Sequence, residues 1–411
     1  MNSFFKNISV QFLGSALAQI IPFLFIPLLS TLFDPVEFSY LTKFQAISAI
    51  LAVFVGFRYY NAIVLPSKIN ISIHLFYISI FSTILFSIFV SFFFLFVDNF
   101  TNYFNDIKFS YVIFPLFVLL YGINISFIQF SVRNKKFKTN SFSKVILSLI
   151  NNTSSSVLGF FNNSFGLVYG RLIGLLFSVI YLYKRVKIKN FRYLKKNKII
   201  DTAHIFKDFP KYTIYPALLD TLSIQALVLA IDFYFDENIL GQFGFMIMFL
   251  GAPLSIISIS FRDVVYQRMS DQYNDQSLKN VHKTFITSLM FLSLIAIFIL
   301  VSFFLIGENI FYLIIDSKWS LAFSFAEILI FSYLLRMIVS PLSTVFNVFN
   351  KLKILSIWQI MAFISTLLTI FLSLEIFKLD ILDFLLIYLI VDILLYVFYL
   401  ILQLYITKIL N

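Results

Sequence analysis

Apolar runs of about 20 residues recur along the whole chain, separated by short polar breaks, and no other feature limits its possible folds as strongly. As an α-helix, a run of this length crosses roughly 30 Å of hydrocarbon. Hydrophobic residues make up 60% of the sequence and charged residues only 12%, a balance that a soluble domain does not have. We therefore expect an all-α polytopic membrane protein.

Reading the apolar runs between polar breaks predicts 12 transmembrane helices. Their approximate ranges are 8–33, 43–65, 74–97, 111–132, 143–161, 164–183, 212–234, 241–261, 284–306, 319–346, 356–375 and 383–407. The fifth contains the polar run "NNTSSS", Asn151–Ser156, which hydrocarbon would not tolerate facing lipid. If this segment spans the bilayer, its middle is expected to face protein or water.

The distribution of basic residues predicts the orientation. Of the 31 Lys and Arg residues, 23 fall on the side of the two termini, and only Lys108, Lys318 and Lys378 fall on the other. By the positive-inside rule both termini are expected to be cytoplasmic. The sequence thus predicts a six-helix lobe at residues 1–183, a basic cytoplasmic linker at 184–211 and a second six-helix lobe at 212–411.

The linker carries ten basic residues and is expected to set the topology and to attract anionic head groups of the lipid bilayer. It has no Gly-rich phosphate loop, aromatic-interleaved basic strand or zinc spacing, so no nucleic acid partner, cofactor or metal is expected. The absence of cysteine also excludes a thiolate metal site or nucleophile.

Two short matches indicate an internal duplication. "LFDPVEF" at the end of the first span matches "YFDENIL" at the end of the seventh, with Asp34 against Asp236, an offset of 202. Phe130 and Asn134 match Phe346 and Asn350, an offset of 216. A longer loop after span eight, assigned to residues 262–283, would account for the difference. Two six-helix units of the same orientation, related by a pseudo-two-fold axis along the membrane normal, are therefore expected.

Charged residues inside the spans are the candidate functional groups, since each costs roughly 2.5–3.5 kcal/mol near a helix centre. Arg58, Arg171 and Arg336 are predicted to line a cationic cavity, because the guanidinium fork matches phosphate or carboxylate. The alternative for Arg58 is snorkelling to the cytoplasmic interface. The alternative for Arg171 and Arg336 is interhelical ion pairing. Asp220 and Asp392 are candidates for ion coupling by carrying a proton.

Two further sets of residues are predicted from their chemistry. The candidate sugar contacts are polar or aromatic side chains beside the predicted cavity: Tyr59, Tyr60, Asn61, Asn151 and Asn152. The hinge candidates are prolines inside spans, which free backbone carbonyls and permit bending: Pro22, Pro27, Pro216, Pro253 and Pro341.

The stretches "GSALAQIIPFLFIPLLSTLFDPVEFSYLTKFQAI", "FRYYNAIVLP", "GLVYGRLIG", "FRDVVYQRMS" and "VSPLSTVFNVFNKLKIL" resemble bacterial polysaccharide flippases of the multidrug/oligosaccharidyl-lipid/polysaccharide (MOP) exporter superfamily. The resemblance runs through both halves. Tyr60 departs from it, since relatives often carry Glu there, which leaves Arg58 without a neighbouring acid.

The resemblance implies a transporter rather than an enzyme. Its cargo would be an undecaprenyl-diphosphate-linked oligosaccharide, moved by alternating access from the cytoplasmic to the periplasmic leaflet of the bacterial inner membrane for O-antigen or capsule synthesis. Other polysaccharide-assembly proteins would be possible partners. An ion-coupled small-solute or drug antiporter of the same superfamily and a membrane polysaccharide polymerase are the alternatives. A polymerase would need a sizeable outer loop, and the longest one predicted is only residues 98–110.

Overall fold

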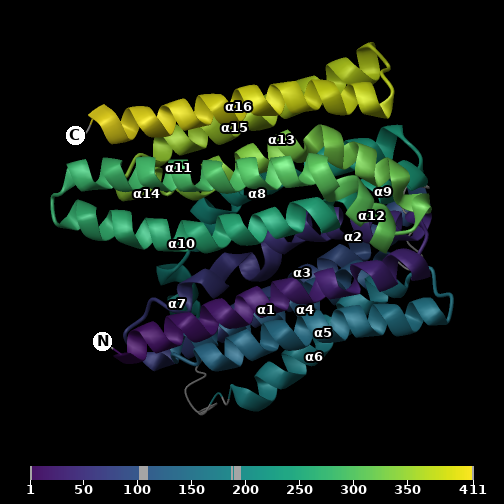
Figure 1. Cartoon of the computed structure of the whole chain (residues 1–411). Coiled ribbons are helices and arrows are strands. Elements are labelled where there is room, and N and C mark those ends of the chain that lie inside the picture. Colours follow the sequence, from purple (N-terminus) through teal and green to yellow (C-terminus); the bar gives the residue numbers. More distant parts are fainter. Residues whose placement is uncertain (1, 101–109, 187, 189–195, 410–411) are drawn as a thin grey trace. The chain divides into compact units, whose positions relative to one another are not determined.

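The computed structural model describes residues 2–100, 110–186, 188 and 196–409 (Figure 1). Over these residues it contains helices and turns and no strand. Lys108, nearly all of the predicted outer loop 98–110, and positions 187 and 189–195 of the predicted linker lie outside the described part of the chain. The all-helical fold class is confirmed.

The chain divides into two compact units, Met1–Gln225 and Ala226–Asn411. The helices of the first unit are α1 (Asn2–Leu32), α2 (Pro35–Phe54), the 3-10 segment η1 (Val55–Ala62), α3 (Ile69–Phe100), α4 (Ser110–Arg133), α5 (Phe137–Phe160), α6 (Gly166–Arg185) and α7 (Lys196–Ile205). Helix α8 (Asp208–Tyr234) continues from the first unit into the second. The predicted linker 184–211 therefore includes a helix, α7, and belongs to the first unit.

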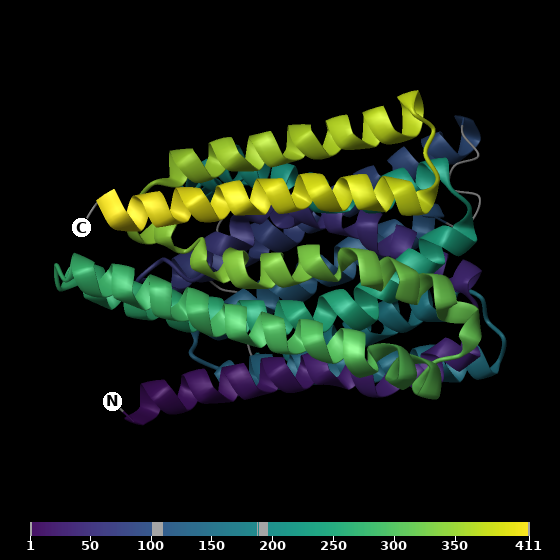
Figure 2. The ribbon, with the colours of Figure 1, turned by 45° about the horizontal axis from the view of Figure 1, so that its top comes forward.

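The second unit contains three π-helical turns between its α-helices. Its elements are α9 (Glu237–Met246), the π-turn η3 (Ile247–Gly251), α10 (Ala252–Asn274), α11 (Leu278–Ser302), the π-turn η4 (Phe303–Gly307), α12 (Glu308–Ile314), η5 (Ser317–Trp319), α13 (Ser320–Leu342), α14 (Val345–Val348), α15 (Leu352–Ile370), the π-turn η6 (Phe371–Ile376) and α16 (Ile381–Ile409). Figure 2 shows α15 and α16 running side by side for most of their length.

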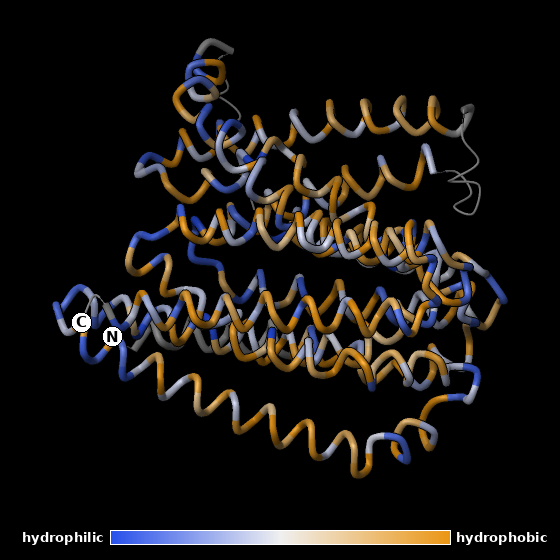
Figure 3. The backbone as a smooth tube through the Cα atoms, turned by 90° about the horizontal axis from the view of Figure 1, so that it is seen from above, coloured by the Kyte–Doolittle hydropathy of each residue, from blue (hydrophilic) through white to orange (hydrophobic). Residues whose placement is uncertain are grey.

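Most residues of each of the 12 predicted spans are helical. Within the described residues, ten helices are long and apolar enough to cross a membrane. The other two predicted spans are α1, whose stretch Leu17–Leu32 is apolar, and α5, whose polar middle lowers its hydropathy. In Figure 3 the apolar colouring follows the helix bodies, and polar colouring gathers toward helix ends and turns. The chain is a multi-pass membrane protein.

The predicted loop at residues 262–283 is wrong, because most of it is helix. Helix α10 continues to Asn274, and α11 begins at Leu278, so only a three-residue turn joins them at the left edge of Figure 1. Val265 and Met269 lie one helical turn apart and are buried against Val281 and Phe285 of α11. A polar stretch with an apolar stripe continues as an amphipathic helix hairpin beyond the apolar run.

Equivalent caps recur in the two units, as the predicted duplication requires. The Asp34 N–H donates to Glu37 Oε2 over 2.9 Å at the start of α2, and Asp236 Oδ1 accepts from the Ile239 N–H over 2.8 Å at the start of α9. Among residues with positive φ are Asn162 after α5 (54°) and Lys378 after η6 (49°), which lie 216 positions apart. This separation repeats the offset found in the sequence.

The fifth span is an unbroken helix, and glycines of α6 allow it to pack closely. A Cβ on Gly170 would lie 2.1 Å from Ser155 Oγ, and one on Gly174 would lie 2.7 Å from the Leu147 carbonyl oxygen. Small residues at four-residue spacing let two transmembrane helices approach in this way. The polar run of α5 is satisfied locally, since Asn152 Nδ2 donates to the Ser148 carbonyl oxygen over 2.7 Å.

The proline hinge candidates occupy different settings. Pro22 and Pro27 lie inside the continuous helix α1, and Pro216 is exposed on α8. Pro253 lies in the first turn of α10, directly after η3. Because proline lacks an N–H and clashes with the preceding turn, it accounts for this π-turn. Pro341 is the penultimate residue of α13 and marks a helix end rather than a bend within the helix.

Candidate functional site

The second span breaks at a left-handed turn. Gly56, Phe57 and Arg58 have φ angles of 57°, 42° and 59°. Only glycine adopts this conformation at no cost, so the backbone strain at Phe57 and at Arg58 costs about 1–2 kcal/mol each. Close packing holds the turn in place, since a Cβ on Gly56 would lie 2.5 Å from Ser79 Oγ of α3. The break places a charged residue inside an otherwise apolar span.

Arg58 has an unsatisfied donor at this turn. Its side chain is half-buried, and its Nε is buried without a hydrogen-bond partner. An unpaired buried donor costs about 1–3 kcal/mol, more when it is charged. Such a group is available to a ligand that brings an acceptor.

Arg171 is the second embedded cation of the first unit. It lies on α6 between the closely packed Gly170 and Gly174 and is half-buried. The phenol of Tyr121 on α4 lies close enough to Arg171 and Arg58 for their charges to act on it, and Tyr60 lies close to both Arg58 and Tyr121. The fold therefore gathers Arg58, Tyr60, Tyr121 and Arg171, here called the basic cluster, inside one unit.

No carboxylate neutralises the basic cluster within the described part of the first unit. In residues 1–185 the only acids are Asp34, Glu37, Asp98 and Asp106. The first two lie at the start of α2, Asp98 lies two residues before the end of α3, and Asp106 falls outside the described residues. The apolar middles of the described spans within residues 1–185 are free of acids, and neither arginine makes an ion pair with a described residue. Asp220 of α8 is the one acid in the middle of a span of this unit beyond residue 185, and it makes no ion pair with either arginine among the described residues. The cluster carries net positive charge.

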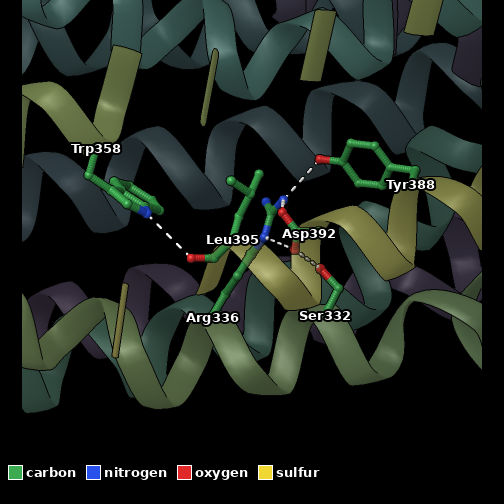
Figure 4. Close-up of polar contacts among 6 residues, drawn as sticks. All are labelled: Ser332, Arg336, Trp358, Tyr388, Asp392 and Leu395. Atoms are coloured by element: carbon green, nitrogen blue, oxygen red, sulfur yellow. Dashed lines mark hydrogen bonds and ion pairs between the residues drawn. The ribbon is translucent and has the colours of Figure 1, made fainter. Parts of the chain in front are cut away.

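In the second unit the embedded arginine, Arg336, is neutralised by Asp392. Arg336 Nη2 and Asp392 Oδ1 are 2.6 Å apart, and Arg336 Nε donates to Asp392 Oδ2 over 2.9 Å (Figure 4). The Ser332 hydroxyl also donates to Asp392 Oδ2. Arg336 Nη2 lies 2.9 Å from the Tyr388 hydroxyl oxygen, to which it donates. We call this group of residues from α13 and α16 the paired cluster.

The aromatic side chains of Tyr396, Trp358 and Tyr399 lie beside the paired cluster. The Arg336 guanidinium carbon lies 5.2 Å from the ring centroid of Tyr396, within cation–π range. Trp358 of α15 stacks on Tyr399 at 3.8 Å, and its Nε1 donates to the Leu395 carbonyl oxygen over 3.3 Å. The side chain of Asp392 is only 7% exposed and that of Arg336 is 27% exposed. Arg336 and Asp392, predicted as separate cargo and proton sites, form one bidentate ion pair.

The predicted sugar contacts are divided between packing and partly accessible positions. The Tyr59 hydroxyl donates to the Ala203 carbonyl oxygen of α7 over 3.2 Å. Tyr60 and Asn152 are buried, whereas Asn61 and Asn151 are half-buried. Asn151 lies at the α5–α6 contact, 3.0 Å from a Cβ added at Gly174. Tyr59, Asn61 and Asn151 are thus the partly accessible members of this set.

Asp220 lies near the middle of α8, is exposed in the structure, and has no ion pair among the described residues. A carboxylate facing lipid at this depth would cost roughly 2.5–3.5 kcal/mol. Its position is therefore better suited to contact with water or protein than with hydrocarbon.

Sequence reasoning missed Tyr121, Ser332, Tyr388 and Tyr396. A spacing signal was present for three of them: Ser332 and Arg336 are four residues apart on α13, and Tyr388, Asp392 and Tyr396 are four apart on α16. Side chains at this spacing share one helix face. No comparable signal marks Tyr121, because its neighbours in the cluster come from other helices.

No protein-family model matches the sequence, and neither does any curated protein. Solved structures do match over nearly the full length. An inward-facing multidrug resistance transporter of the MATE family has a TM-score of 0.69 and 12% identity, covering 95% of this chain and 96% of that one. The chain has the fold of MOP superfamily transporters. An outward-facing MATE family structure gives a TM-score of 0.68 at 11% identity, covering 98% of this chain and 96% of that one.

A third structure with this fold is a MOP superfamily transporter from Pyrococcus furiosus. Its TM-score is 0.67 at 12% identity, with 98% of this chain and 96% of that one covered. It is described as having a binding pocket of reverse polarity that suggests a different function. In that protein the polarity of the binding pocket is the stated ground for suggesting a different function.

Proposed function

We propose that the protein is a flippase that moves an undecaprenyl-diphosphate-linked oligosaccharide from the cytoplasmic to the periplasmic leaflet of a bacterial inner membrane. The observation that carries the proposal is the basic cluster. Arg58 and Arg171 lie in spans that have no acid in their apolar middle, so their charge is available to an anionic ligand.

A diphosphate suits the basic cluster for physical reasons. Guanidinium groups bind phosphate oxygens through short, charge-assisted hydrogen bonds, and these are strongest where water is scarce. The buried Nε of Arg58 lacks an acceptor, which a phosphate oxygen would supply. A ligand of this charge would also offset the cost of holding two cations in the span interior.

The paired cluster has a different role from the basic cluster in this proposed flippase. Arg336 is already bound in bidentate fashion by Asp392, so it is a weaker candidate for binding the diphosphate than Arg58 and Arg171. Proton uptake by Asp392 would break this pair and free the guanidinium. The pair therefore fits a role in coupling or in holding α13 against α16. We also propose that the cargo is moved by alternating access and that this cycle is coupled to an ion.

An ion-coupled antiporter of drugs or small solutes is the second candidate. It is favoured by the fold, which the chain shares with multidrug resistance transporters. A cationic drug would be repelled by the net positive basic cluster, so this candidate requires an anionic or neutral solute. The two candidates differ in what accumulates when the protein is lost.

Deletion in a strain carrying the cognate glycan genes tests the proposal. We expect lipid-linked repeat units to accumulate on the cytoplasmic leaflet and surface polysaccharide to fall, measured by glycosidase accessibility in spheroplasts and by surface staining. Complementation with the wild-type chain should restore both. Normal surface polysaccharide with altered susceptibility to toxic solutes would instead favour the antiporter.

A further inference from the structure

Helix α7 and the first turns of α8, residues 198–215, have two faces of different character, and we call them the interfacial segment. On one face, Ile199, Ala203, Phe206 and Phe209 pack against the first unit's buried cluster, which includes Leu182 of α6. The segment is therefore fixed to the end of the bundle between two membrane spans, α6 and α8.

Two side-chain contacts reinforce this attachment. Thr202 Oγ1 donates to the Lys198 carbonyl oxygen over 2.7 Å, and it lies 3.1 Å from His74 Nδ1 of α3. The Tyr59 hydroxyl donates to the Ala203 carbonyl oxygen, so the segment also holds the residue next to Arg58.

The opposite face exposes large apolar side chains together with lysines. Ile200, Ile205, Tyr212 and Tyr215 are 57%, 72%, 61% and 70% exposed. The lysines Lys198, Lys207 and Lys211 are exposed on the same segment. The Lys211 ammonium lies 4.9 Å from the ring centroid of Tyr212. Four exposed apolar side chains within one short segment are unfavourable in water.

We propose that this outer face lies in the head-group layer of the membrane and binds anionic phospholipid. A helix with basic residues and exposed isoleucine, placed between two spans, has the composition of an interfacial helix. Tyrosine is enriched at the same depth, where one end of the ring is apolar and the other is wet. The segment itself carries three exposed lysines against two exposed acids, Asp201 and Asp208. The linker residues 184–197 directly before it add seven basic residues and no acid, so the charge of the whole stretch selects an anionic surface.

The attachment gives this lipid contact a consequence for the second span. The interfacial segment holds Tyr59, and Tyr59 follows Arg58 in the broken turn, so lipid bound outside stabilises the position of that turn. This lipid contact does not depend on the cargo that the protein carries.

The chain has no cysteine, so single labelling sites can be introduced directly. Spin labels at Ile200→Cys and Ile205→Cys are compared with a control at Asp275→Cys, exposed in the turn between α10 and α11. The full chain is reconstituted in nanodiscs with and without phosphatidylglycerol. Accessibility to oxygen and to a water-soluble nickel complex reports whether each label lies in lipid or in water.

We expect both α7 labels to be oxygen-accessible and nickel-protected, with protection increasing when phosphatidylglycerol is present, while the control stays nickel-accessible. The substitutions Lys198→Gln, Lys207→Gln and Lys211→Gln together should remove the phosphatidylglycerol dependence. The matched set Lys279→Gln, Lys283→Gln and Lys353→Gln, all exposed elsewhere, should leave it intact. Nickel accessibility at 200 and 205 equal to the control, or protection independent of lipid charge, would overturn the proposal.

Discussion

At the level of single residues, the embedded arginines differ in whether their substitution leaves a buried carboxylate without a counter-charge. Arg336→Gln leaves the carboxylate of Asp392 buried without a counter-charge, which costs about 3–5 kcal/mol. The variant Arg336→Gln/Asp392→Asn should recover most of this loss. Thermal unfolding of the purified protein measures both. Arg262→Gln, which removes the exposed pair with Asp263, is the control and should cost less than about 1 kcal/mol.

If Arg336→Gln alone leaves the unfolding temperature unchanged, the paired cluster does not hold α13 and α16 together.

Arg171→Gln should behave differently from Arg336→Gln, because no described carboxylate loses a partner when Arg171 is replaced. We expect unchanged membrane abundance and reduced export of surface glycan. The sequence identified these charged residues and left interhelical pairing open, but it did not show that Arg336 pairs with Asp392, because the two are 56 positions apart and come together only through the α13–α16 contact.

At the level of helices, the close approach of α5 and α6 rests on glycine. Gly170→Ala would place a Cβ 2.1 Å from Ser155 Oγ, and overpacking of this kind costs typically about 1–3 kcal/mol. A lower unfolding temperature is expected. Gly307→Ala serves as the control, since its nearest neighbour would be a ring carbon of Phe303 at 3.3 Å. Equal unfolding temperatures for the two variants would show that the α5–α6 packing adapts to the extra carbon.

Helix positions followed from hydrophobic runs, whereas departures from regular helix did not. Residues 262–274 are polar enough to resemble a loop, yet Val265 and Met269 bury an apolar stripe that makes them helical. The left-handed turn at Gly56–Arg58 lies inside an apolar run, so hydropathy does not reveal it. Its conformation depends on contact with Ser79, a tertiary feature that local sequence does not encode.

For the whole molecule, the resemblance in sequence predicted the superfamily fold, and solved structures with 11–12% identity confirm that fold. Cargo is a separate matter, because one fold supports transporters with different sites. The uncompensated charge of Arg58 and Arg171 is the feature of this chain that bears most directly on cargo.

Binding of undecaprenyl-diphosphate-linked oligosaccharide to the purified protein tests the central claim most directly. The measurement compares wild type, Arg58→Gln/Arg171→Gln and the exposed control Arg268→Gln, with an undecaprenol-linked glycan lacking phosphate as the neutral ligand. Losing two hydrogen bonds to a charged group, each worth about 1.5–3 kcal/mol, should weaken diphosphate binding at least about a hundredfold. The control and neutral-ligand binding should not change. Equal affinity of wild type and the double variant for the diphosphate ligand would contradict the account.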